Sequence, residues 1–242
     1  MSYYNEVFMD QIGTYVHRYG LDSLLSPDLA RELRLLRKKP GEIIIRAGDP
    51  VGNILFLVEG RSKVFSTLDN GQSVLAAFYA PFDVLGEAEL FSSERYALTV
   101  QAITDTVCLG IPMASIRKAA DRNGRLFMYL CGRLGMKLLT RNLAESINLR
   151  YQVENRLASY LLASTDEEGR ILGTDDLGEL ADFLGASYRQ LARVVRRFRS
   201  EGIMEGSRGR IRVLDRARLE PLAGDLYARP SEGQRSRAMR SS

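Results

Sequence analysis

The stretch that decides the fold is GASYRQLARVVRRFRSEG, residues 185–202, which contains five arginines and no lysine. Its apolar residues recur with the period of an α-helix and share one face: Leu191, Val194, Val195 and Phe198. On the opposite face lie Arg189, Arg193 and Arg196. Ser187 with Gln190 three residues later is typical of a capping box, and Gly202 follows the last turn, where glycine often ends a helix. The stretch therefore predicts an amphipathic helix with a basic outer face.

The preceding residues TDDLGELADFLG, 174–185, predict a second short helix. Its apolar face is formed by Leu177, Leu180, Ala181 and Leu184. Asp176 followed by Glu179 is a further start signal, and Gly185 lies in a very short connection to the arginine-rich helix. Two short helices joined by a tight turn make a helix-turn-helix unit, whose second helix enters the major groove of DNA.

Residues 203–214, IMEGSRGRIRVL, predict a short hairpin, or wing, beside the two helices. Ile203 and Met204 precede a glycine-containing turn, after which Ile211 and Val213 alternate with arginines. A basic wing next to this helix favours double-stranded DNA as the partner, because the arginine fork can bond guanine as well as phosphate. The alternative, from the residues alone, is a charged helix face that only faces water.

The charge of the chain is unevenly distributed. The net charge is only +4, but residues 187–242 hold 14 arginines against six acidic residues, a balance of +8. The remainder, residues 1–186, holds 20 basic and 24 acidic residues, a balance of −4. A basic C-terminal part joined to an acidic remainder indicates a polyanion bound at one end.

The N-terminal residues lack the basic start and apolar core of a signal peptide, and no run approaches the ~20 apolar residues of a membrane helix. Two cysteines, Cys108 and Cys131, do not make a disulfide framework and fit a reducing compartment. We therefore expect a cytoplasmic protein without a membrane partner. The tail, residues 223–242, is basic and rich in serine, and is expected to be disordered.

Residues 1–123 predict a domain in which helices precede a β-roll. Residues 3–37 look helical, with a break near Gly20. From Gly41 on, short β-rich runs are punctuated by glycine, and Asn70-Gly71 between two runs is a strong hairpin signal. Regularly spaced short strands predict a small antiparallel barrel or roll, which is filled by side chains or holds one small ligand.

Residues 124–150 predict one long helix. A leucine stripe recurs along it: Leu126, Leu130, Leu134 and Leu138. Part of the stripe can cover the roll, but a helix this long and apolar favours a second partner, and another copy of the chain is the economical choice. The alternative is a single core helix within a monomer. Residues 151–222 then form the DNA-binding domain, which begins with a shorter helix at 152–165.

This order of β-roll, long helix and winged helix-turn-helix resembles the cAMP receptor protein / fumarate–nitrate regulator (CRP/FNR) family of bacterial transcription factors. The matching motifs are GEIIIRAGD at 41–49, LGEAEL at 85–90, VENRLASYLL at 153–162 and LADFLGASYRQLARVVRRF at 180–198. GASYR is most similar to the YeiL-like branch. The resemblance implies an α+β fold with a cyclic-nucleotide-binding-like roll and a homodimer on a palindromic operator. Its recognition helices would lie about 34 Å apart, and RNA polymerase would be a further partner of an activator.

The resemblance also assigns DNA-binding positions. Major-groove positions fall on Ser187, Tyr188, Arg189 and Arg193. Arg193 matches a family arginine that contacts guanine, whereas Tyr188 and Arg189 replace an arginine and an acid of the best-known members, so a different operator is expected. Phosphate contacts are expected from Arg196 and Arg197 and from the wing residues Arg208, Arg210 and Arg212.

In the roll, the resemblance implies an effector site. Family members that bind cyclic AMP use a Gly-Glu pair at the ribose, which Gly86-Glu87 matches. The alternative is that the Glu87 carboxylate caps nearby backbone N–H groups. The Arg-Ser pair that holds the cyclic phosphate is replaced by Tyr96 and an alanine, with Arg95 one residue early. Adjacent strand residues point to opposite faces, so Arg95 substitutes only if a bulge re-aims it.

The adenine-contacting Thr-Ser pair of those family members is replaced here by Arg141-Asn142. Cyclic AMP is therefore not expected as the effector, which stays unidentified. The iron–sulfur type of sensor in this family uses four cysteines, and this chain has two, so the alternative is a cluster bridged across a dimer by two cysteines from each chain. A single histidine, His17, is a poor basis for haem, so neither cofactor nor any metal site is expected. Cys108, among apolar residues of a predicted strand, favours a buried thiol, and Cys131 is the better candidate for a reactive one.

The leading interpretation is a dimeric DNA-binding transcription regulator controlled by an unidentified effector. The alternative is an effector-binding module that regulates a protein partner without binding DNA. An enzyme is not expected, because one histidine provides no Ser/His/Asp set and the sequence shows neither a glycine-rich phosphate loop before a helix nor a metal-ligand cluster.

Overall fold

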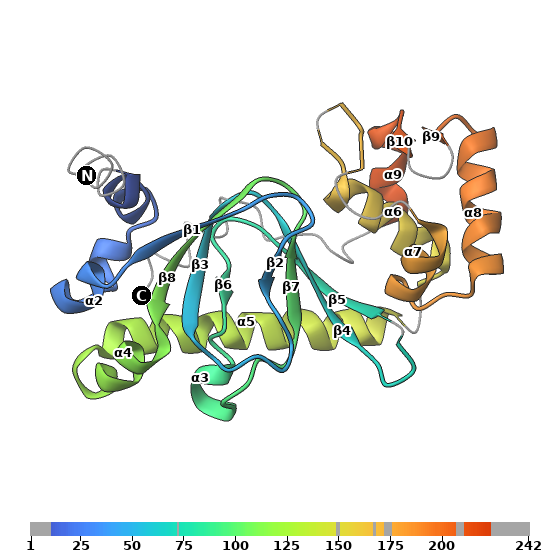
Figure 1. The fold of residues 1–242 in the computed structure, drawn as a ribbon. Coiled ribbons are helices and arrows are strands. Elements are labelled where there is room, and N and C mark those ends of the chain that lie inside the picture. The colour runs from blue at the N-terminus through green and yellow to red at the C-terminus, as the bar shows by residue number, and fades with distance from the viewer. Residues whose placement is uncertain are drawn as a thin grey trace. The chain divides into compact units, whose positions relative to one another are not determined.

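The computed structural model describes residues 11–71, 73–148, 151–166, 168–171, 176–206 and 211–223, apart from the side chains of residues 121 and 140–148. The chain divides into two compact units, which we call the roll unit (1–143) and the helix-turn-helix unit (144–242). Figure 1 shows helices and strands mixed in both, in the order roll, long helix and winged helix-turn-helix. The predicted fold class is confirmed.

The roll unit begins with short helical segments: a helix over residues 11–18, η1 (Leu21–Ser23) and α2 (Pro27–Arg31). Ser26 caps α2, because its hydroxyl accepts a hydrogen bond from the Leu29 N–H. The expected helix up to residue 37 is wrong at its end. Residues 34–38 form strand β1 (Arg34–Lys38), since they pair antiparallel with β8 (Thr106–Pro112) and long-range pairing overrides their helical pattern.

Two four-stranded sheets form the roll (Figure 1). The first has the order β1–β8–β3–β6, with β3 at Asn53–Glu59 and β6 at Val84–Leu85. The second has the order β2–β7–β4–β5, with the bounds Ile43–Ile45, Thr99–Ala102, Ser62–Thr67 and Ser73–Tyr79. The Asn70-Gly71 hairpin between β4 and β5 is confirmed, and Gly71 has a φ of +83°, which favours glycine.

Strand β3 is buried on both of its faces. Leu55 and Leu57 point between the two sheets, where they pack with Val64 and Cys108. The alternating residues, such as Phe56, pack on the outer face against the N-terminal helices, α4 (Met113–Lys118) and α5 (Gly124–Asn148). An almost continuous apolar run is the pattern of a strand that is covered on both sides.

Helix α5 runs along the roll (Figure 1), and its side chains form one buried and one exposed apolar face. Leu126 and Leu130 are 0% exposed and belong to the core of their own roll unit, so the expectation that they form a dimer seam is corrected: they are not accessible to a partner. Leu134 is half-buried, and Leu138 is 60% exposed. The other exposed large apolar residues of α5 are Met128, Met136 and Leu139.

The helix-turn-helix unit contains α6 (Val153–Ser164), α7 (Leu177–Phe183), α8 (Tyr188–Ser200) and α9 (Arg216–Ala223). The predicted wing is present as β9 (Met204–Glu205), which pairs antiparallel with β10 (Arg212–Val213). Residues expected as a plain loop after α6 add two isolated bridges, Thr165 with Ile171 and Arg170 with Arg212. In the parts of the chain that the structure describes, every helix is too short or too polar to cross a bilayer.

Candidate nucleic-acid interface and effector site

The N-terminus of α8 is held by its predicted capping box. The Ser187 hydroxyl accepts a hydrogen bond from the Gln190 N–H at 3.2 Å, and the Gln190 side-chain oxygen accepts one from the Ser187 N–H at 3.1 Å. Asp176 caps α7 by accepting from the N–H groups of Gly178 and Glu179. Because the cap fixes where α8 begins, it also fixes the direction of the first exposed side chains, Tyr188 and Arg189.

The turn between α7 and α8 is tight and is held by hydrogen bonds from a side chain of α6. Gly185 has a φ of +58°, and the Ala186 N–H donates to the Ala181 carbonyl at 3.0 Å. The Arg156 guanidinium on α6 donates to the carbonyls of Leu184 and Gly185. Sequence reasoning missed Arg156, because nothing in the local pattern of α6 shows that it faces a turn about 30 residues away.

One face of α8 is apolar and buried and the opposite face is basic and exposed, as predicted. Leu191, Val195 and Phe198 are buried against the other helices, and Val194 is half-buried. Arg189, Arg193 and Arg196, which we call the arginine stripe, are exposed. Within the described ranges, Arg189 and Arg193 have no hydrogen-bond or ion-pair partner, so both guanidinium groups are free to bind an external anion.

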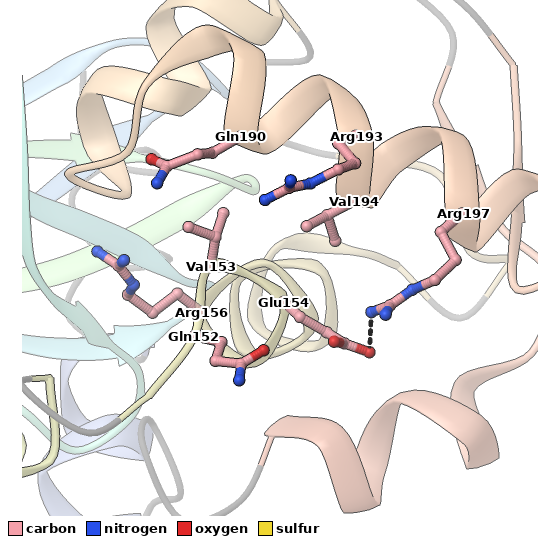
Figure 2. A pocket seen from close by; sticks show the side chains of 8 residues that line it. All are labelled: Gln152, Val153, Glu154, Arg156, Gln190, Arg193, Val194 and Arg197. Carbon is pink, nitrogen blue, oxygen red and sulfur yellow. Dashed lines mark ion pairs between the residues drawn. The ribbon is translucent and has the colours of Figure 1, made fainter.

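A groove of about 520 Å³ separates α8 from the start of α6 (Figure 2). Its lining residues are Gln152, Val153, Glu154, Arg156, Gln190, Arg193, Val194 and Arg197. In Figure 2 the side chains of Gln190 and Arg193 extend from α8 towards Val153. Three arginines against one carboxylate make this groove basic, which suits it to a phosphate.

Arg197 differs from the other arginines of α8. Its guanidinium forms an ion pair with Glu154 across the groove, and its Nε atom lies 3.8 Å from a carboxylate oxygen of Glu201 (Figure 2 shows the first pair). The hydrogen bond with Glu154 raises the pKa of Arg197. The sequence placed Arg197 with the phosphate-contacting residues, but it did not reveal that two carboxylates of the same unit already surround it.

The wing is described only in part. Arg212 is exposed, and its Nε atom donates to the Glu168 carbonyl at 3.0 Å. Ile211 and Val213 are buried, as the alternation predicted. Arg208 and Arg210 lie outside the described residues, so their expected phosphate contacts stay predictions.

In the roll, the Glu87 carboxylate is 3% exposed and pairs with a lysine. The Lys137 ammonium of α5 lies 2.5 Å from the Glu87 Oε1 atom and 2.5 Å from the Val84 carbonyl, and 4.1 Å from the centre of the Tyr79 ring. Burial alone would lower the pKa of Lys137, but Tyr79 and Glu87 raise it overall. The carboxylate thus holds an ammonium from α5, an arrangement that neither the ribose nor the backbone-cap interpretation anticipated.

A second ion pair, Arg133 with Asp83, lies one turn earlier on α5. Sequence reasoning missed both α5 partners. The available signal was a matched spacing: the two acids, Asp83 and Glu87, are four residues apart, and so are the two bases, Arg133 and Lys137. Together with Leu126 and Leu130, these bases form the face of α5 that contacts the roll.

The side chains at and beside the positions that match the phosphate-binding pair form hydrogen bonds within the roll itself. Tyr96 is buried, and its hydroxyl accepts from the Asn53 N–H and donates to the Asn53 carbonyl at 2.8 Å. Arg95 is exposed and donates to the Gly48 carbonyl at 2.6 Å. At Gly86, an added Cβ would lie 2.9 Å from the Asn53 carbonyl oxygen and 3.3 Å from the Tyr96 ring. The side chains of Arg141 and Asn142 lie outside the described residues.

The thiols differ as the sequence indicated. Cys108 is buried between the sheets, and burial raises its pKa to about 12, so the thiolate that would react is suppressed. Cys131 is exposed on α5. His17 is exposed. Across the described ranges, no three side chains of the metal-binding types gather into one group.

Comparison with known protein families agrees with this architecture. Residues 35–123 match the cyclic nucleotide-binding domain, and residues 155–222 match the Crp-like helix-turn-helix domain. The regulatory protein YeiL of Escherichia coli O157:H7 is 28% identical over 199 residues, which cover 82% of this chain and 90% of that protein. The transcriptional activator protein Anr of Pseudomonas aeruginosa is 24% identical over 216 residues and 84% of each chain.

Solved structures share the fold. A CRP/FNR-family chain from Eubacterium rectale superposes with a TM-score of 0.71 at 21% identity, over 84% of this chain and 97% of that one. FixK2 from Bradyrhizobium japonicum gives a TM-score of 0.60 at 23% identity, over 79% and 98%. With both domain families matched in this order, the chain belongs to the CRP/FNR family of transcriptional regulators.

Proposed function

We propose that the protein is a homodimeric regulator that binds a palindromic DNA operator sequence-specifically, under the control of an effector or signal received at the roll. The observation that carries the proposal is the arginine stripe on a capped helix whose opposite face is buried. A rigid helix with free arginines is suited to the major groove, because each arginine fork can bond a guanine edge. The protein would act in the cytoplasm, with RNA polymerase as a second partner if it activates transcription.

The dimer is supported by the outer face of α5. Met128, Leu138 and Leu139 are exposed there, and the space around Gly132 and Gly135 is open. Large apolar residues on one exposed helix face are costly in a monomer, and small residues beside them let a second helix approach closely. Pairing of two copies through this face would give the two-fold symmetry that a palindromic operator needs.

Arg193→Ala is expected to weaken operator binding by about 1–3 kcal/mol and to relax the preference at one base pair per half-site, because it removes a bidentate base contact. The measurement is a binding titration with an operator selected from random duplexes and with variants at each base pair. Arg193→Lys is the matched control: it keeps the charge, so the salt dependence should persist while the base preference is lost. Unchanged affinity and preference in Arg193→Ala would contradict the assignment of α8.

Cyclic AMP is expected to leave DNA affinity unchanged and to bind with a dissociation constant weaker than roughly 1 mM. The reason is that the Tyr96 hydroxyl already forms hydrogen bonds with the backbone of Asn53, and the Glu87 carboxylate is already neutralised by Lys137. Calorimetry with the full chain is the direct measurement. Micromolar binding that disappears in Arg95→Ala would contradict this expectation, since it would mean that Arg95 leaves the Gly48 carbonyl to hold the phosphate.

A further inference from the structure

Glu154 lies where an acidic residue is unexpected, in a groove that is otherwise basic. It belongs to the first turn of α6, and its side chain is 19% exposed and directed at α8 (Figure 2). It forms an ion pair with the Arg197 guanidinium, on the same groove wall as Arg193 one helical turn earlier. A carboxylate at a surface that meets phosphate costs affinity for every DNA sequence, so its presence calls for a physical reason.

The three arginines of the groove are not equivalent. Arg156 is bound to the carbonyls of the α7–α8 turn, and Arg197 lies between the carboxylates of Glu154 and Glu201. Arg193 alone, of these three, has no ion pair or hydrogen bond to another residue in the described ranges. The groove therefore has one guanidinium, that of Arg193, that is free to contact DNA.

We propose that Glu154 withholds Arg197 from the DNA backbone and so limits the sequence-independent part of DNA affinity. This rests on the proposed function. A guanidinium that meets phosphate releases counterions and strengthens binding to every sequence, whereas one neutralised within the protein does not. Helix α8 then contacts DNA through the arginine stripe, in which Arg189 and Arg193 are the residues proposed to contact bases. The acid in the groove thus lowers affinity for every duplex by the same factor, although it touches no base.

Glu154→Gln is expected to release Arg197 and to steepen the dependence of log affinity on log salt by about 0.9, the value of one phosphate contact. Between about 50 and 200 mM salt, the ratio of variant to wild-type affinity should therefore fall about 3.5-fold, on a selected palindromic duplex and on a scrambled one alike. The double variant Glu154→Gln/Arg197→Gln should return to the wild-type slope, because the intact pair contributes no contact.

Two controls separate this effect from others. Glu220→Gln removes one exposed acid of α9 that does not line the groove, and should leave the slope unchanged. Glu154→Asp keeps the charge and should behave as the wild type. Thermal unfolding by circular dichroism checks that each variant is folded before its slope is compared with that of the wild type.

The outcomes are distinct. A wild-type slope unchanged by Glu154→Gln would overturn the inference and leave the proposed function standing, as would an equal effect of Glu220→Gln. A double variant with a shallower slope than the wild type would also overturn it, because Arg197 would already contact phosphate in the native complex. Failure of the wild-type protein to bind any duplex would instead overturn the proposed function, and this inference with it.

Discussion

Lys137→Met is expected to lower the free energy of unfolding by about 3 kcal/mol, because it leaves a buried carboxylate without its counter-ion. Glu87 is 3% exposed, and Lys137 supplies the ammonium that neutralises it and also hydrogen-bonds the Val84 carbonyl. Methionine keeps most of the length of the side chain, so the change tests mainly the charge rather than the packing. Urea unfolding of the full chain, followed by the circular dichroism of the roll, is the measurement.

The double variant Glu87→Gln/Lys137→Met is the control for this buried pair. It removes both charges, so it should recover a large part of the lost stability. A loss of less than about 1 kcal/mol in Lys137→Met would contradict the prediction, since that is the range of a solvent-exposed ion pair. The same result would mean that the ion pair between Glu87 and Lys137 contributes little to the packing of α5 on the roll.

Leu138→Asp/Leu139→Asp is expected to convert the proposed dimer into a monomer and to weaken operator binding at least about 100-fold, because two charges would be buried at the seam. Both leucines are 60% exposed, so the folded roll unit itself should tolerate the change. Sedimentation equilibrium at several concentrations and titration of a palindromic duplex are the measurements.

Leu214→Asp is the matched control for that variant, because Leu214 is a similarly exposed leucine in the helix-turn-helix unit. It should remain a dimer and keep its operator affinity. A wild-type chain that sediments as a monomer at every concentration would contradict the dimer, and the exposed face of α5 would need another partner.

The features that the sequence predicted are those that neighbouring residues determine. Ser187 with Gln190 defines the start of α8, and the period of Leu191, Val195 and Phe198 defines its buried face, so both follow from residues within one or two turns. The Asn70-Gly71 hairpin is equally local. The family motifs extended this information to the order of the domains.

The features that the sequence did not predict depend on which distant surface each residue meets. Glu87 and Lys137 are fifty residues apart, and so are Asp83 and Arg133. The leucine stripe of α5 looks continuous along the chain, yet Leu126 faces the roll while Leu138 faces solvent. One helical period cannot distinguish two apolar faces that are buried by different partners. Strand β1 was missed for the same reason, because its pairing with β8 lies outside the local pattern.

The capped helix α8 has a calorimetric consequence. Ser187 and Gln190 cap its first turn, and at its end the Glu201 N–H donates to the Arg197 carbonyl. In its middle, Leu191 and Val195 are buried. Such a helix is already folded before it meets DNA, so association need not supply the entropy of forming it. The heat-capacity change on binding should then reflect only the surfaces brought into contact by α8. The much larger negative value that accompanies a segment folding as it binds should be absent for this helix.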